Sequence, residues 1–204
     1  MSDSMAAALT QVRTTPGLAA ALRRGVFRPI GEVPEVWSLL AHWGQDLDDS
    51  RAEAIFRALC LYAIHIQSVA AGVDCHKPGT PASSDSPARP GPNLGDAIAR
   101  LARHSGGALE ARRMSEDAIN RRLARAMGAR NQAELVQTLS SLVRLMKDQH
   151  HPVQLDYNQL ARDIYSWGYL DGRAQVQKHW GLAFARASQP STNNPDQENT
   201  DNAA

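Results

Sequence analysis

Aromatic residues are scarce in this chain, since Phe, Trp and Tyr together make up only 5% of its 204 residues. Branched and aromatic residues never cluster in the alternating pattern that predicts a β-strand. Ala, Leu and Arg, which favour helices, are abundant instead. The composition therefore predicts an all-α protein, and the length suffices for one solid core or two small helical bundles.

Cysteine is also rare, and the two that occur, Cys60 and Cys75, lack the spacing of a metal-binding pair. Two isolated cysteines are typical of a protein from a reducing compartment. The longest apolar stretch, from Ala54 to Val73, is interrupted by Arg57 and His65, so it predicts a buried helix rather than a membrane span. We therefore expect a cytoplasmic protein that does not bind a membrane.

Sequence motifs of catalysis are missing: the chain has no GxSxG, HExxH, GxGxxG or Walker-type glycine–lysine motif. The adjacent His150 and His151 do not share a helix face and have no nearby ligand set, so a turn is the better interpretation. Cys75 and His76 fall in a loop, and the aspartates just before Ser50 lack the spacing of a calcium loop. The sequence thus predicts no catalytic residues, no metal site and no cofactor.

Charge is unevenly distributed, although the formal net charge is only +1. The segment from Ser191 onward holds three acidic residues and no basic one, which leaves 22 basic against 18 acidic residues, or +4, in the rest. Between Arg100 and Arg130 there are eight Arg against three acidic residues, or +5. The opposite sign is concentrated in a short acidic stretch near the N-terminus: Glu32, Glu35, Asp46, Asp48 and Asp49.

Lysine occurs only three times, so 19 of the 22 basic residues are Arg. Arg binds phosphate with two parallel hydrogen bonds and stacks on bases, which Lys does not. This bias favours a protein that binds a polyanion. An equally simple interpretation is that Arg-rich usage follows a GC-rich genome.

Four regions are predicted along the chain. Residues 1–72 form an N-terminal helical bundle and residues 94–188 a C-terminal helical bundle. Between them, residues 73–93 are rich in Pro, Gly and Ser and cannot bury enough apolar area to offset the entropy of ordering, so we expect a mobile surface loop there. Residues 189–204 are polar and are predicted to form a disordered tail.

Helix starts are predicted from residues whose side chains can accept a hydrogen bond from the free N–H groups of a first helical turn. Two of them are followed three residues later by Glu, as in a capping box. These predicted starts are Ser50, Ser115, Asn131, Asp156 and Asp171.

Phosphate-binding candidates lie on the helix predicted from Ser115. With Ile119 and Leu123 facing inward, a rotation of about 100° per residue places Arg121 and Arg125 on the opposite side, with Arg122 beside them. No aromatic residues alternate with these arginines, which favours contacts to the phosphate backbone over base stacking.

Other arginines extend this candidate surface. Arg112 and Arg113 are expected just before the helix, Arg130 just after it, and Arg100 and Arg103 on the polar side of the preceding helix, so that several guanidinium groups could line one groove. The alternative is a solvated face with local Arg–Glu pairs. The complete candidate set for nucleic-acid binding is Arg23, Arg24, Arg100, Arg103, Arg112, Arg113, Arg121, Arg122, Arg125 and Arg130.

Several short motifs, in order over most of residues 17–186, resemble the CasB family, the small subunit of the type I-E CRISPR surveillance complex Cascade. Each motif is weak alone, but their order and spacing are fairly specific. They are Gly17–Arg24, Trp37, Asn93–Ile98, Asn120–Leu123, Leu142–Met146, Leu155–Leu160, Tyr165–Trp167 and His179–Phe184.

The resemblance implies a non-catalytic subunit made of two α-helical bundles. It also implies a second copy of the chain bound head to tail, a large subunit and backbone subunits as partners, and contacts that hold the target strand and the displaced non-target strand of the R-loop. Pairing with the guide reads the sequence in such complexes, while protein contacts to the backbone tip a nearly balanced strand exchange. The chain departs from the family pattern at Asp96, where Arg is common, and in its long linker and acidic tail.

Two other functions are compatible with the sequence. A helical transcription regulator would use residues 121–131 and the helix after Asn131 as a helix-turn-helix, although that second helix is predicted to be buried. An unrecognised helical enzyme would use His150 or His151.

Overall fold

The structure is a computed structural model that describes residues 2–44, 47–69, 74–80, 89–104, 109–147 and 152–189, without the side chains of residues 2, 68, 104 and 109–116. Among these residues the all-α prediction is confirmed, and the β-type pairing consists of isolated bridges. The α-helices are α1 Ser2–Thr14, α2 Pro16–Gly25, α3 Val36–Leu40, α4 Asp49–His65, α5 Leu94–His104, α6 Leu109–Met127, α7 Gln132–Lys147, α8 Tyr157–Trp167 and α9 Leu170–Ser188. Short 3-10 turns are η1 Ile30–Glu32, η2 Ala41–Trp43 and η3 Ile66–Ser68.

Side-chain caps fix the starts of α7 and α8, as the sequence predicts. Asn131 Oδ1 accepts a 2.9 Å hydrogen bond from the backbone N–H of Glu134. Asp156 Oδ1 accepts two such bonds from the first turn of α8, at 3.0 and 3.1 Å. Each cap satisfies N–H groups that have no partner within the helix, and so places the first turn precisely.

Three other predicted starts are wrong. The cap of α4 is Asp48 rather than Ser50, since the Asp48 side chain accepts from the backbone N–H three residues on. Helix α6 begins at Leu109 instead of near Ser115, because the intervening residues are mostly strong helix formers. Asp171 lies inside the first turn of α9, which starts one residue earlier without a side-chain cap.

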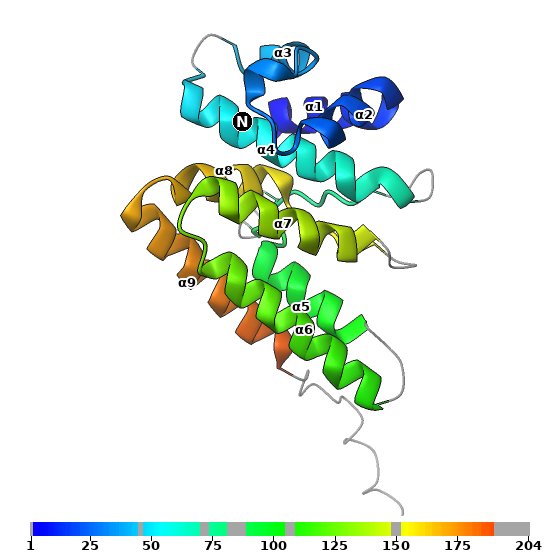
Figure 1. Cartoon of the computed structure of the whole chain (residues 1–204), viewed down its shortest axis with the longest axis vertical. Coiled ribbons are helices and arrows are strands. Elements are labelled where there is room, and N and C mark those ends of the chain that lie inside the picture. Colours follow the sequence, from blue (N-terminus) through cyan, green and yellow to red (C-terminus); the bar gives the residue numbers. More distant parts are fainter. Residues whose placement is uncertain are drawn as a thin grey trace, which may run out of the picture.

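The helices form layers along the long axis of the molecule (Figure 1). Helices α1 to α4 lie at one end, α5, α6 and α9 at the other, and α7 and α8 between them. Helix α4 packs against α2 on one side and against α7 and α8 on the other, while α9 packs against α5 and α8. The middle layer, α7 and α8, therefore joins the two ends of the molecule. The predicted division into bundles of residues 1–72 and 94–188 stays a prediction.

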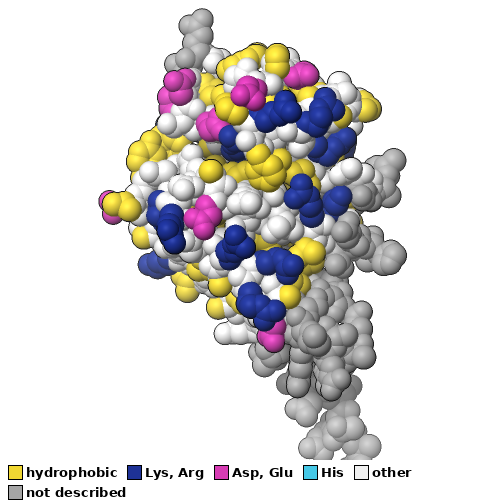
Figure 2. Space-filling model, viewed as in Figure 1, with side chains coloured by type: hydrophobic (Ala, Val, Ile, Leu, Met, Phe, Trp, Pro, Cys, Tyr) yellow, Lys and Arg dark blue, Asp and Glu magenta, His cyan; other side chains and the backbone are white. Residues whose placement is uncertain are grey.

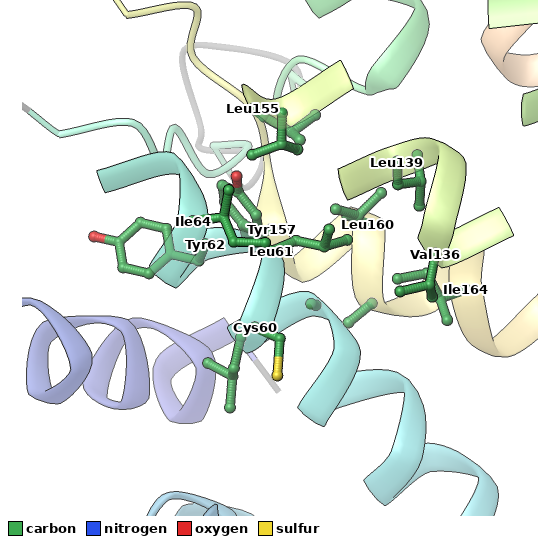
Figure 3. Packing of buried hydrophobic residues seen from close by; sticks show 14 of the residues in the cluster. Cys60, Leu61, Tyr62, Ile64, Val136, Leu139, Leu155, Tyr157, Leu160 and Ile164 are labelled. Carbon is green, nitrogen blue, oxygen red and sulfur yellow. The ribbon is translucent and has the colours of Figure 1, made fainter. Parts of the chain in front are cut away.

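A hydrophobic core continues through these layers. Figure 3 shows its centre, where side chains from α4, α7 and α8 and from the segment just before α8 meet. Burial of these residues joins α4 to α7 and α8, which begin more than 65 residues after α4 ends. The labelled residues are Cys60, Leu61, Tyr62, Ile64, Val136, Leu139, Leu155, Tyr157, Leu160 and Ile164.

The described ends of the segment predicted as a mobile loop are packed. Cys75 is fully buried, and its carbonyl accepts a 2.9 Å hydrogen bond from the backbone N–H of Leu155. The N–H of Asp156 donates to the carbonyl of Pro92 at 2.8 Å. Pairing with the segment before α8 thus supplies the hydrogen bonds and burial that the local sequence does not indicate.

No helix in the part of the chain that the structure describes combines the length and the apolar character needed to cross a lipid bilayer.

Candidate nucleic-acid interface

Helix α6 separates an apolar face from a basic one. Ile119 and Leu123 are buried, at 4% and 5% exposure, in contact with the core. Arg121, Arg122 and Arg125 are exposed. Helical spacing produces this separation, because residues two positions away from a buried one point to the opposite side. This part of the sequence prediction is confirmed.

Most guanidinium groups of this basic face have no hydrogen-bond or ion-pair partner among the described residues. Arg121 and Arg125 make no side-chain hydrogen bond or ion pair with any described residue, whereas Arg122 Nη1 donates a 3.2 Å hydrogen bond to the carbonyl of Ala118 on its own helix. Arg130 is exposed in the turn between α6 and α7, and only its backbone N–H bonds to Glu134 Oε2, at 2.9 Å. Arg121, Arg125 and Arg130 can therefore approach a phosphate without breaking a side-chain hydrogen bond or ion pair with a described residue, whereas Arg122 would give up its bond to Ala118.

Two arginines on α5 are more constrained than the sequence predicts. Arg103 is exposed, but its Nη1 donates a hydrogen bond to the carbonyl of Ala187 at the end of α9. Arg100 is half-buried. Arg103 thus satisfies one of the free carbonyl groups at the C-terminus of α9, a structural role that phosphate binding would disturb.

The N-terminal candidates also differ from each other. Arg23 is half-buried, and its Nη1 donates a 3.4 Å hydrogen bond to the carbonyl of Ala63 near the end of α4. Arg24 is exposed on the outer side of α2. Arg23 therefore joins α2 to α4, and Arg24 is the better placed of the two to meet a ligand.

Arg112 and Arg113 are predicted to precede the Arg121 helix. Both instead belong to α6, which already begins at Leu109. Their side chains fall outside the described residues.

The arginines of α6 and α7 belong to one face of the molecule. Helix α6 packs against α5 and α7, and Figure 2 shows Lys and Arg side chains spaced over the face that α6 and α7 present, with fewer Asp and Glu side chains between them. Arg144, exposed near the end of α7, is a further candidate that the sequence prediction omits. Its Nη1 donates a 3.4 Å hydrogen bond to Oγ of Ser140 on the same helix.

The predicted arginine-lined groove stays a prediction. Cavities of the described structure lie beside α3 and α4, between α4 and α8, and around the start of α8, and neither Arg121, Arg122, Arg125 nor Arg130 lines these three. The four arginines are exposed, which suits contact with an extended strand.

Candidate catalytic groups are placed unfavourably for catalysis. Burial raises the pKa of the Cys75 thiol to about 12, so it is not a thiolate at neutral pH. The neighbouring His76 uses Nδ1 to accept a 3.1 Å hydrogen bond from the backbone N–H of Tyr157. Among the described residues no group of three or more His, Cys, Asp or Glu side chains could hold a metal ion. His150 and His151 lie outside the described residues.

A buried hydrogen bond connects α4 to α8. His65 is fully buried, and its Nδ1 lies 2.8 Å from the hydroxyl oxygen of the equally buried Tyr157. Burial lowers the pKa of His65 to about 4, so its ring is neutral at physiological pH. This histidine is a core residue, and it lies in the stretch from Ala54 that the sequence predicts to be a buried helix.

Helix α7 is packed on several sides, which bears on the alternative of a helix-turn-helix regulator. It contacts α4, α6 and α8, and its buried residues include Leu135, Leu139, Leu142 and Met146. A recognition helix must present a broad polar face to the major groove. The buried position of α7 therefore argues against that role.

Comparisons with known proteins agree with this architecture. A family model described as CRISPR-associated protein Cse2 matches residues 18–184. The crystal structure of CasB from Thermobifida fusca is similar over 82% of this chain and 83% of that chain, with 26% identity and a TM-score of 0.58. The crystal structure of M. ruber CasB has the same fold over 92% of this chain and 95% of that chain, with 20% identity and a TM-score of 0.61.

No curated protein matches this sequence. The family model nevertheless spans most of the chain, from the start of α2 to the last turns of α9, and the T. fusca CasB structure agrees with it in fold and extent. The chain therefore belongs to the CRISPR-associated Cse2 family, also called CasB, of the type I-E complex Cascade.

Proposed function

We propose that this chain is the non-catalytic small subunit of a type I-E CRISPR RNA-guided complex and that it stabilises the R-loop. In this role it binds phosphates of the target strand and of the displaced non-target strand. The residues that bind are the exposed arginines of α6, Arg121, Arg122 and Arg125, together with Arg130 in the following turn. Arg144 extends this surface on the neighbouring helix α7, and Arg24 is a separate candidate on α2, at the other end of the molecule.

The observation that carries the proposal is which arginines already have a hydrogen-bond partner within the protein. Arg121 and Arg125 are exposed on a helix whose other face is buried, and neither has a side-chain partner among the described residues. Arg23 and Arg103, in contrast, bond to backbone carbonyls of neighbouring helices. Arginines without internal partners are the ones whose charge is available to phosphate.

A modest basic surface suits this task. Exchange of a DNA duplex for an RNA–DNA hybrid is nearly balanced in free energy, so a few phosphate contacts are enough to shift it. A net charge of +4 without the acidic tail is too small for tight binding to free DNA. The surface therefore acts within an assembled complex, where other subunits hold the guide and target.

The partners in this proposal are the large subunit, the backbone subunits and a second copy of the chain bound head to tail. Membership of the family supports association with other subunits of the complex. Two copies in a row would place two basic faces along the same strand and would lengthen the path along which the displaced strand is held.

A double charge reversal tests the proposal. Arg121→Glu with Arg125→Glu should leave the fold intact, because both side chains are exposed. The complex that contains this variant should bind double-stranded target more weakly, while its binding to single-stranded target, which displaces no strand, should change less. The slope of log affinity against log salt should also flatten by roughly 0.7 for each lost single-strand phosphate contact.

The matched control is Arg162→Glu with Arg186→Glu, the same charge change at exposed positions on α8 and α9. This control should bind both targets like the wild type. If the α6 variant binds double-stranded target with wild-type affinity, these arginines lie on a solvated face and do not bind nucleic acid. The interface would then have to be sought around Arg24 and Arg144.

A further inference from the structure

The C-terminal segment of this chain, residues 190–204, carries charge of the opposite sign to α6. This acidic tail holds Asp196, Glu198 and Asp201 and neither Lys nor Arg. It has no aromatic residue and no Val, Leu, Ile or Met, so it has little apolar area to bury against a partner. A contact that the tail makes must therefore be mainly electrostatic. The structure describes the chain up to Gln189, directly before the tail.

Arg121 and Arg125 have no paired counter-charge on their own helix. They lie four residues apart on the exposed side of α6, where two like charges repel each other. Asp117, one turn before Arg121, is exposed and makes no ion pair with a described residue. Glu134 uses Oε2 to accept from the backbone N–H of Arg130. Positive potential therefore remains over this basic face until an anion approaches it.

Helix α9 leads the chain past α6 to the start of the tail. Gln177 Nε2 donates a 2.6 Å hydrogen bond to the carbonyl of Met127, so α9 passes the end of α6 that carries Arg125. Between Gln177 and Ser188, α9 continues for about 17 Å, at 1.5 Å per residue. Figure 1 shows its last turns at the end of the molecule that α5 and α6 also occupy.

The tail is long enough to return over this distance. Glu198 follows Gln189 by nine residues, and a chain of that length spans up to about 30 Å when it is extended. Asp201 can reach roughly 10 Å further. A short tether of this kind holds a group at an effective concentration on the order of millimolar. Weak ion pairs that are negligible between separate molecules are therefore populated within one chain.

We propose that the acidic tail binds the basic face of α6 when no nucleic acid is present, with its carboxylates paired to Arg121 and Arg125, and that it competes there with DNA phosphates. The competition rests on the proposed function, whereas the contact between tail and helix does not. Exposed ion pairs are weak and screened by salt, so a continuous strand displaces the tail without rearranging the helices. The tail thus lowers binding to stray DNA, while a strand held close by the guide complex still displaces it.

The contact is tested on the free full-length chain with a nitroxide spin label at Gln197→Cys, between two of the tail carboxylates. The label reacts selectively at this position because Cys60 and Cys75 are both buried. We expect the backbone amide NMR signals of Arg121 and Arg125 to be broadened by the label at low salt. They should recover as added salt screens the ion pairs.

The reference is the same labelled chain with a neutral tail, made by Asp196→Asn, Glu198→Gln and Asp201→Asn. This variant keeps the length of the tether and removes its charge, so it measures the broadening that tethering alone produces. The acidic tail should broaden the α6 signals more than the neutral tail does. Equal broadening with the two tails would overturn the proposal.

Competition is tested in the assembled complex with the neutral-tail variant. Its affinity for double-stranded target should rise by roughly two- to tenfold at low salt, as for a few exposed ion pairs, and the gain should disappear at high salt. Arg121→Glu with Arg125→Glu should abolish this gain, because the tail then has no cation to bind. The matched control is Glu32→Gln with Glu35→Gln and Asp49→Asn, the same change in charge at exposed positions at the other end of the molecule, and it should raise the affinity far less.

Three results of the affinity measurements would overturn the proposal. These are wild-type affinity of the neutral-tail variant, an equal gain from the control variant, and a gain that survives the arginine reversals. Unchanged target binding of the arginine reversals alone would instead overturn the proposed function, and with it the competition. The NMR broadening would still decide whether the tail and α6 touch, so the two failures are distinguishable.

Discussion

The indole Nε1 of Trp180 donates a 2.7 Å hydrogen bond to Oδ2 of Asp163, and both residues are buried where α8 meets α9. The other oxygen, Oδ1, accepts from Gln159 Nε2 at 2.8 Å. Burial raises the pKa of Asp163 from 3.8 to about 6, although both hydrogen bonds favour the charged form. A carboxyl group in the core of this protein therefore titrates within an accessible pH range.

Asp163→Asn should change how stability depends on pH. Because the folded protein holds the Asp163 proton more tightly than the unfolded chain does, the free energy of unfolding falls as pH rises from about 4 to about 6. Two pH units between the folded and unfolded pKa correspond to about 2–3 kcal/mol at most. Asparagine keeps the acceptor for Trp180 and removes this slope, so the variant should gain stability relative to the wild type over this range.

Urea midpoints measured from pH 4 to pH 7 would check this. The neutral form of His65 contributes an opposite slope, but it does so in both proteins and cancels in their difference. Asp171→Asn, at an exposed carboxylate on α9, serves as the control. Parallel pH profiles for the wild type and Asp163→Asn would contradict the prediction.

Leu160→Ala and Trp180→Ala should each destabilise the protein by about 2–5 kcal/mol, through lost burial and a residual cavity. Leu160 is 1% exposed, and Trp180 is fully buried with its ring stacked 5.5 Å from that of Trp167. Leu182→Ala, at a residue that is 52% exposed, should cost far less. Chemical denaturation of the three variants would decide, and equal midpoints would mean that the two core positions are not packed.

Gly95→Ala should destabilise the contact between α5 and α9. A Cβ at this position would collide with the carbonyl oxygen of Trp180 and lie 2.9 Å from the backbone nitrogen of Phe184, so one helix must move. The expected cost is about 1–3 kcal/mol. Gly17→Ala is the matched change, because nothing lies within 4 Å of its Cβ, and it should gain up to about 1 kcal/mol in helix α2. A melting temperature that moves in the same direction for both would contradict the geometry.

Tyr157→Phe should cost about 1–3 kcal/mol, because it leaves the buried Nδ1 of His65 without its partner. Tyr169→Phe removes a hydroxyl whose partner, Tyr165 at 3.4 Å, is accessible to water, and it should be nearly neutral. Thermal unfolding of both variants measures the difference. An unchanged melting temperature for Tyr157→Phe would contradict the prediction and would indicate that a water molecule replaces the lost hydroxyl.

Much of the helical architecture is predictable because its signals are local. The apolar spacing of Leu94, Ile98 and Leu101 indicates α5, and the side chains of Asn131 and Asp156 indicate the starts of α7 and α8. Each pattern lies within one or two helical turns of the sequence. The same local reasoning places Arg121 and Arg125 on the solvent side of α6.

The features that the sequence does not predict depend on contacts between residues that are distant in the chain. Arg23 bonds to a carbonyl 40 residues later, so its partial burial has no local signature. The pairing of Cys75 with Leu155 spans 80 residues and holds a segment whose composition resembles a loop. The cavity beside α3 and α4 is lined by Trp37 and also by Gln132, which only the packing of α7 against α4 brings there.

Helix α7 has a mechanical consequence for the subunit. It begins at Gln132, beside α3 and the start of α4, and ends with Arg144 and Lys147 in its last turn. A helix of 16 residues is about 24 Å long, and this one is held by packing against α4, α6 and α8. The distance between the residues at its two ends is therefore set by one helix, and it cannot change without loss of the packing that joins the two ends of the molecule.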